Sequence, residues 1–163
     1  MDAVELRRLL DYDPATGIFR WRVRTSSRAA AGDVAGFSRD DGYRLIGVKG
    51  RMYLVHRLAW LHTTGDWPAA TVDHIDRDPT NNRFTNLRAA SHSQNACNKA
   101  VPRNNTSGFK GVVWHKKSKV WQAQIKKRGK MYYLGSFNAP ELAGRAYAEA
   151  SKRLHGSFGR PVC

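Results

Sequence analysis

The sequence predicts an α+β protein made of two small domains, and three features of the chain support this. Short alternating apolar segments separated by turn residues fill residues 12–55, which is typical of β-hairpins. A polar, turn-rich run at 101–107 then has the composition of a linker. After it, three strand-like segments precede one amphipathic helical segment. The predicted domains therefore span residues 1–100 and 108–163, joined by the linker at 101–107.

The first domain is expected to be rich in hairpins. A short helical turn at 5–10 leads into a hairpin at 12–24, because D-P-A-T-G at 13–17 is a turn sequence followed by alternating apolar residues. A second hairpin is predicted at 43–55, with its turn at 49–51. Residues 56–63 have apolar positions at helical spacing, and Gly65 and Pro68 end that helix.

The second domain is predicted to be a three-stranded antiparallel sheet packed on one helix. The strands are expected at 111–115, 120–127 and 131–137, and the helix at 140–155, where a proline suits the first turn. Alternation places Trp121, Ala123 and Ile125 on one face of the sheet and Gln122, Gln124 and Lys126 on the other. The helix residues expected to cover the first face are Leu142, Ala146, Tyr147, Ala150 and Leu154.

The charge balance favours a nucleic acid as partner. Lys and Arg outnumber Asp and Glu 28 to 13, which gives a formal net charge of +15. Residues 1–99 hold 15 basic and 11 acidic residues, whereas residues 100–163 hold 13 and 2. A protein this basic attracts polyanions. The excess on the C-terminal third predicts that this part binds the nucleic acid.

The sequence argues against membrane attachment, against secretion and against a fold held by cysteines. The sequence has no long apolar segment that would suit a membrane, and its N-terminus lacks the pattern of a secretion signal. We therefore expect a cytoplasmic protein. Only Cys97 and Cys163 are present, without a C-x-x-C pair, so neither a disulfide framework nor a zinc site is expected.

One stretch of the first domain has the residues that phosphodiester cleavage needs. V-D-H-I-D at 72–76 is followed by N-N-R at 81–83, T-N-L-R at 85–88 and S-Q-N at 93–95. Cleavage requires a base that activates water and a cation held by hard oxygen ligands. Asp73, His74 and Asn95 supply these groups. Asp and Asn clusters also form turns and helix caps, and we favour that role for Asp76, Asp78, Asn81 and Asn82.

These motifs resemble the HNH (ββα-metal) homing endonucleases of phages and group I introns, in the subfamily that has Asn in place of the last His. V-H-R-L-A at 55–59 also resembles the segment that precedes the family's motif. The resemblance spans about residues 5–99 and implies one divalent metal per chain, with Mg²⁺ expected and Mn²⁺ the alternative. It makes His74 the general base and Asp73 and Asn95 the metal ligands. It gives Asn86 the task of fixing the loop after the strand of His74, and with it the orientation of that histidine. Contacts with phosphate near the site are expected from His56, Arg57, Asn82 and Arg83. For His56, capping or packing is the competing interpretation.

The second domain resembles an AP2/ERF-type DNA-binding domain over about residues 107–160. The landmarks are G-V at 111–112, W-x-A-x-I at 121–125, L-G-x-F at 134–137 and A-x-x-A-Y at 143–147. The plant members have arginines where Val113, His115 and Met131 stand here, so their base specificity does not transfer. The lysines of this domain could contact DNA or could simply form the solvated rim of a hairpin, and we favour contact with DNA. The residues expected to contact DNA are Lys110, His115, Lys116, Lys117, Lys119, Gln122, Gln124, Lys126, Arg128, Lys130 and Tyr133.

The sequence therefore predicts a monomeric, metal-dependent endonuclease that acts on double-stranded DNA. One active site per chain predicts a nick in one strand. The main alternative is a DNA-binding regulator whose HNH part is a non-catalytic scaffold. An RNA-directed protein is a third hypothesis, which basicity alone permits, although the chain has no RNA-stacking motif.

Overall fold

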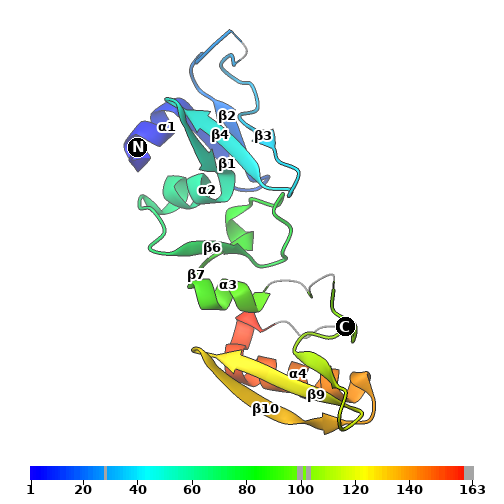
Figure 1. Ribbon diagram of the computed structural model, residues 1–163. Coiled ribbons are helices and arrows are strands. Elements are labelled where there is room, and N and C mark those ends of the chain that lie inside the picture. Colours follow the sequence, from blue (N-terminus) through cyan, green and yellow to red (C-terminus); the bar gives the residue numbers. More distant parts are fainter. Residues whose placement is uncertain (28, 99–100, 102–103, 160–163) are drawn as a thin grey trace. The chain divides into compact units, whose positions relative to one another are not determined.

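The computed structural model describes residues 1–27, 29–98, 101 and 104–159, and it divides into two units (Figure 1). The units are Met1–Ser91 and His92–Cys163. Both combine helices with short antiparallel strands, so the predicted α+β class is confirmed. The division precedes the linker predicted at 101–107, because the helix at 92–98 is hydrogen-bonded to Lys110 and groups with the C-terminal unit.

The first unit contains three small sheets and two main helices. Its elements are α1 (Ala3–Leu9), β1 (Leu10–Asp13), β2 (Ile18–Trp21), β3 (Phe37–Ser38), β4 (Arg44–Val48), β5 (Arg51–Leu54), α2 (Val55–Thr64), β6 (Thr71–His74), the 3₁₀ turn η1 (Phe84–Asn86) and β7 (Leu87–Ala90). β1 pairs with β2, β4 lies between β3 and β5, and β6 pairs with β7. Both predicted hairpins and the predicted helix are therefore present, with bounds shifted by one to three residues.

The core of the first unit forms where α1, the hairpins and α2 meet. Leu6, Leu10, Ile46 and Leu58 are fully buried there. Burying an aliphatic side chain of this size stabilises the fold by about 1.5–3 kcal/mol. α2 ends at Gly65, which takes the left-handed conformation (φ 90°) that a C-terminal glycine accommodates. This core supports the hairpin β6–β7.

The turn between β1 and β2 braces the loop that follows β6. Gly17 has φ +77°, and a Cβ on it would lie 2.5 Å from the carbonyl carbon of Asn82. Only glycine permits this approach. The hydroxyl of Tyr12 on β1 donates a 2.7 Å hydrogen bond to the carbonyl oxygen of Asn82. The N-terminal hairpin thus fixes the backbone of Asn82.

The second unit is a three-stranded sheet with one long helix, preceded by a short helix. Its elements are α3 (His92–Asn98), β8 (Val112–His115), β9 (Val120–Lys127), β10 (Lys130–Phe137), α4 (Pro140–His155) and the 3₁₀ turn η2 (Gly156–Phe158). The strand order is β10-β9-β8, and α4 packs on the sheet. Ala123 and Ile125 are buried beneath the helix, as alternation predicted.

The predicted orientation of α4 is wrong at one residue. Leu142, expected to cover the sheet, is 48% exposed, whereas Ala143 is fully buried. The small residues of this helix allow close packing: a Cβ on Gly144 would lie 2.4 Å from the ring of Phe109. Leu134, which lies at a bulge in β10, packs against the core instead. The helix therefore approaches the sheet through Ala143 and Gly144 rather than through Leu142.

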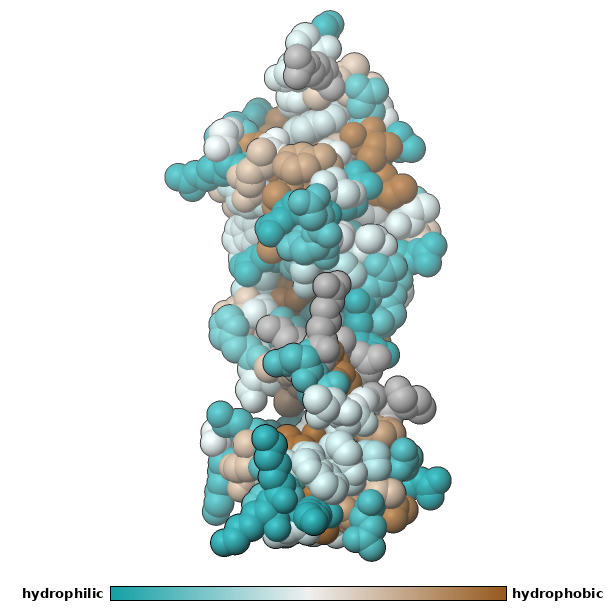
Figure 2. All heavy atoms as spheres, turned by 45° about the vertical axis from the view of Figure 1, so that its right-hand side comes forward, coloured by the Kyte–Doolittle hydropathy of each residue, from teal (hydrophilic) through white to brown (hydrophobic). Residues whose placement is uncertain are grey.

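The outer face of the sheet is open and mixes polar with apolar side chains. Direct cross-strand pairs join Val113 to Gln122, Gln124 to Tyr133 and Lys126 to Met131. On the face of the second unit that Figure 2 presents, hydrophilic residues predominate and apolar patches are small. No helix among the described residues has the length and hydropathy needed to cross a membrane.

Candidate active site

The hairpin β6–β7 positions Asp73 and His74. In its register Asp73 faces Arg88 and His74 faces Leu87 across the two strands. Both Asp73 and His74 are only 5% exposed. Adjacent residues of a strand point to opposite faces, and accordingly the two side chains have different neighbours. The hairpin therefore places a carboxylate and an imidazole next to each other but in separate surroundings.

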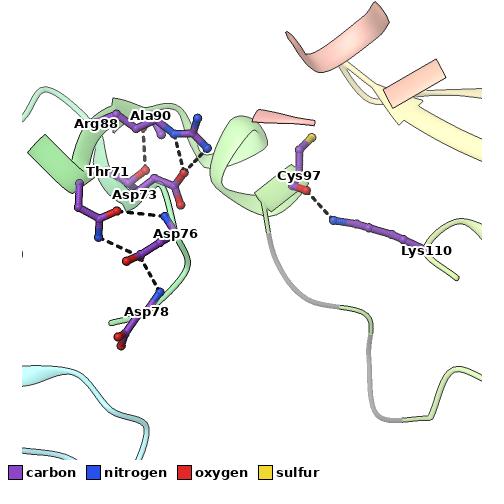
Figure 3. A network of polar contacts seen from close by, with 9 residues as sticks. Thr71, Asp73, Asp76, Asp78, Arg88, Ala90, Cys97 and Lys110 are labelled. Atoms are coloured by element: carbon purple, nitrogen blue, oxygen red, sulfur yellow. Dashed lines mark hydrogen bonds and ion pairs between the residues drawn. The ribbon is translucent and has the colours of Figure 1, made fainter. Parts of the chain in front are cut away.

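Asp73 forms a buried ion pair with Arg88. Its Oδ2 accepts hydrogen bonds from Nε at 2.9 Å and from Nη2 at 2.8 Å of Arg88 (Figure 3). The Arg88 side chain is 15% exposed. Hydrogen bonds between ionised groups are short and strong, and removing one member of a buried pair leaves an uncompensated charge. Arg88 thus fixes the orientation of the Asp73 carboxylate, a role that the sequence did not reveal without the strand register.

The ring of His74 is oriented by Asn82. His74 Nε2 lies 3.2 Å from Asn82 Oδ1, and the Asn82 amide nitrogen donates to the carbonyl oxygen of Thr80 at 3.0 Å. Because that nitrogen is used as a donor, Oδ1 accepts from the ring, so His74 has its proton on Nε2. Asn82 is 2% exposed, so it contacts the histidine rather than standing open to a phosphate.

His56 packs against His74. The two rings lie 4.9 Å apart in an edge-on arrangement, and the ring of Tyr43 lies 5.5 Å from His56 and 6.0 Å from His74. Burial, with smaller contributions from His74 and Arg57, lowers the pKa of His56 to about 3. His56 is therefore neutral at physiological pH. From the sequence, His56 could either pack within the fold or contact a phosphate. In the structure it packs against Tyr43 and His74.

Asn86 closes the loop that follows His74. Its Oδ1 accepts from the backbone N–H of Asp76 at 3.1 Å, and its Nδ2 donates to Asp76 Oδ1 and to the carbonyl oxygen of Asn81. Burial raises the pKa of Asp76, but hydrogen bonds from Asp78, Asn86 and Asn81 outweigh it and lower the pKa overall. Asp76 accepts from the backbone N–H of Asp78 (Figure 3), Asp78 from that of Thr80 and Asn81 from that of Arg83, so these side chains make turns, as expected.

The remaining residues predicted near the site have other contacts. The guanidinium of Arg57 lies 5.8 Å from the centre of the Trp67 ring. Arg83 Nε donates to the carbonyl oxygen of Ala15 at 2.6 Å. Asn95 lies on α3, in the second unit. Its metal-binding role stays a prediction.

The donor chemistry of the hairpin suits a hard cation. Asp73 supplies carboxylate oxygens, which Mg²⁺ prefers, and Mg²⁺ usually keeps several of its waters. Among the described residues, no group of three or more His, Cys, Asp or Glu side chains is placed to hold a metal ion. An ion at this site would therefore depend on few protein ligands.

Comparison with known proteins assigns the family. A family model described as HNH endonuclease matches residues 53–97, which include β6 and β7. Protein 3.8 of Escherichia phage T7 is 34% identical over 106 residues, covering 64% of this chain and 87% of that protein. The chain belongs to the HNH endonuclease family. It is accordingly a nuclease, and nucleases of this family typically use a divalent metal.

Three further matches cover different lengths of this chain. An uncharacterized HNH endonuclease (L560) of Acanthamoeba polyphaga mimivirus is 31% identical over 121 residues; the match covers 74% of this chain and 62% of that protein. A solved structure of the HNH homing endonuclease I-HmuI, described as showing DNA binding and cleavage, shares 26% identity with a TM-score of 0.44, covering 59% of this chain and 54% of that one. The AP2-like ethylene-responsive transcription factor TOE2 of Arabidopsis thaliana is 34% identical over 55 residues, or 34% of this chain and 11% of that protein.

The residues predicted to contact DNA are found mainly on the sheet of the second unit of this nuclease. Tyr133, on the outer face, is 63% exposed, and its hydroxyl lies 2.7 Å from Ser136 Oγ. His115 Nδ1 accepts a hydrogen bond from the backbone of Ser118. Lys110 is different, because its ammonium donates to the carbonyl oxygens of Cys97 (Figure 3) and Ala96 in α3.

Proposed function

We propose that this HNH endonuclease is a metal-dependent enzyme that nicks one strand of double-stranded DNA. The observation that supports this best is the pairing of an oriented imidazole, His74, with a carboxylate held by Arg88 on one hairpin. A general base and a hard-cation ligand are the groups that phosphodiester hydrolysis needs. In this proposal the hairpin is the cutting element.

His74 is proposed to take the proton of the attacking water. The contact with Asn82 orients the ring, and Asn82 is itself held by Tyr12 and Thr80. His56, buried beside the ring, is neutral, so it does not add a positive charge next to the base. General-base catalysis of this kind contributes about 10²–10⁴-fold to a rate.

Asp73 is proposed as a ligand of one Mg²⁺ ion, with Mn²⁺ as the alternative and Asn95 as a second ligand. The bound ion would neutralise charge on the phosphate oxygens as the bond breaks. The role of Asn95 rests on the resemblance of S-Q-N at 93–95 to the family motif. Arg88 restrains Asp73, so the carboxylate is already in place before an ion arrives.

The second unit is proposed to grip the DNA as an AP2-like module. It has the predicted three strands and one helix, and the partial match to a plant AP2-like factor agrees with this. Its partly exposed glutamines, Gln122 and Gln124, would read base edges, and its exposed lysines would contact phosphates. A monomer with one cutting hairpin would leave one nick per binding event. The expected setting is the cytoplasm of a phage-infected or bacterial cell, at the nucleoid.

A plasmid assay tests the proposal. Purified protein with supercoiled plasmid and Mg²⁺ should give relaxed circles, EDTA should stop the reaction, and Asp73→Asn should be inactive at the same Mg²⁺ concentration. Lys49→Gln, a substitution outside the site, is the control variant and should remain active. Binding to DNA without any nick would favour the regulator with a non-catalytic HNH scaffold. Cleavage that continues in EDTA would contradict metal dependence.

A further inference from the structure

The second unit contains a pocket that the proposed cutting mechanism does not use. Its volume is about 320 Å³, and its wall includes Cys97, Lys110, Lys126, Arg128, Tyr147 and His155. The wall is thus formed by α3, the segment before β8, the end of β9 with the turn that follows it, and α4. Ligand pockets of proteins begin at about 300 Å³. The volume is therefore sufficient for a phosphate group with an attached sugar or base.

The pocket is strongly basic. Lys110, Lys126, Arg128 and His155 line it, and none of its lining residues is acidic. Residues 100–163 contain only two acidic residues, Glu141 and Glu149. The pKa of His155 is lowered, first by burial and then by Lys127 and Lys110, which agrees with a positive potential here. Positive charge that has no acidic group facing it attracts an anion.

One wall of the pocket is fastened by Lys110. Its Nζ donates to the carbonyl oxygen of Cys97 at 2.7 Å (Figure 3) and to that of Ala96 at 3.3 Å. Both carbonyls belong to the last turn of α3, where a cation is favourable because it complements the helix dipole. Lys110 therefore holds α3 against this side of the unit rather than projecting from it.

The neutral groups of the wall also suit a phosphate ester. Burial raises the pKa of Tyr147 to about 12, so its phenol keeps its proton. The uncharged side chains of Ser93 and Cys97 also line the pocket. These groups give the pocket an uncharged part beside its cations, which suits a sugar or base attached to the phosphate.

We propose that this pocket binds a phosphate group, and that in the working enzyme the phosphate belongs to the DNA backbone. The identity of the carrier rests on the proposed function, whereas the anion site does not. A phosphate bound between Arg128 and His155 would restrain the turn of the sheet and the wall formed by α3. Because α3 also carries Asn95, DNA binding in the pocket would stiffen the helix that bears the predicted metal ligand.

The experiment is a titration of the full chain with inorganic phosphate, followed by amide ¹H–¹⁵N correlation spectra at constant ionic strength set with chloride. We expect saturable shifts at Ser93, Cys97 and Gly129. Arg128→Gln with His155→Gln should weaken this binding at least tenfold. The matched control, Lys152→Gln with Arg153→Gln, also changes two basic residues, but both lie outside the pocket, and it should bind phosphate as the wild type does. Equal weakening in both variants, or no saturable shift at the pocket, would overturn the anion site.

Two further titrations identify the source of the phosphate. A short DNA duplex added to the phosphate-saturated protein should displace phosphate and move the same amide signals. A duplex that binds without moving them would overturn the assignment to DNA, and tight binding of 5′-AMP in that case would assign a free nucleotide. Phosphate binding in a chain that fails the plasmid assay would contradict the proposed function while supporting the anion site.

Discussion

The two units of this nuclease use polar residues in opposite ways. Residues 1–91 contain 14 basic and 11 acidic residues, and their key polar side chains, Asp73, His74 and Asn82, are buried and hydrogen-bonded. Residues 92–163 contain 14 basic and only 2 acidic residues, and most of the predicted DNA contacts are exposed. A buried hydrogen-bond network is disrupted when any one of its members is removed. Exposed charges instead contribute to binding in proportion to their number, and salt screens them. Single substitutions should therefore affect the first unit strongly and the second in proportion to the charge removed.

The largest effect on stability is expected from Arg88→Met. The substitution leaves Asp73 buried without its cation, which typically costs about 3–5 kcal/mol. Chemical denaturation at pH 7 would measure the free energy of unfolding. The double variant Asp73→Asn with Arg88→Met should recover much of the lost stability, because no buried charge remains, while staying inactive. A loss below about 1 kcal/mol in the single variant would show that the pair behaves like a surface salt bridge.

A graded effect is expected from the lysines of the turn between β8 and β9. Replacing Lys116, Lys117 and Lys119 by glutamine should leave the unfolding temperature unchanged and weaken DNA binding. Removing one contact with phosphate should reduce the slope of log K against log salt by about 0.9, and should weaken binding by about 1 kcal/mol at physiological salt. Fluorescence anisotropy at several salt concentrations measures this slope. An unchanged slope would identify these lysines as a solvated rim.

A smaller, pH-dependent effect is expected from His56. Its pKa is about 3 in the folded chain, compared with about 6.5 when unfolded. The unfolded chain therefore binds more protons between these values, so stability is complete above pH 6.5 and falls as the pH decreases, by up to about 1.4 kcal/mol per unit. His56→Leu should flatten the dependence of unfolding free energy on pH between 6.5 and 4. An equally steep dependence in this variant would place the titrating group elsewhere.

Local sequence signals predicted most of the fold. Turn sequences such as D-P-A-T-G and alternating apolar residues predicted the hairpins, and a proline at the first turn predicted the correct bounds of α4, Pro140–His155. The orientation of Leu142 was missed because it depends on how closely Gly144 approaches Phe109, a tertiary contact that helical periodicity does not contain.

The candidate site was predicted in part, for a similar reason. The types and spacing of Asp73, His74 and Asn86 are visible in the sequence, because the motif is local. The partners of these residues are not. Arg88 reaches Asp73 only through the register of β6 and β7, and Asn82 reaches His74 because Gly17 and Tyr12 fix its backbone from a distant hairpin. The sequence does not distinguish Lys110 from the other lysines of the second unit. Its role follows from the hydrogen bond that it donates to the carbonyl oxygen of Cys97 in α3.

The most direct test of the division between cutting and gripping is single-turnover cleavage by His74→Ala at saturating DNA, with the dissociation constant measured in parallel. We predict a rate about 10²–10⁴-fold below that of the wild type with an unchanged dissociation constant, because the base is lost while the sheet that we propose to bind DNA is intact. Cleavage at the wild-type rate by this variant would contradict the assignment of His74 as the general base and, with it, the hairpin β6–β7 as the cutting element.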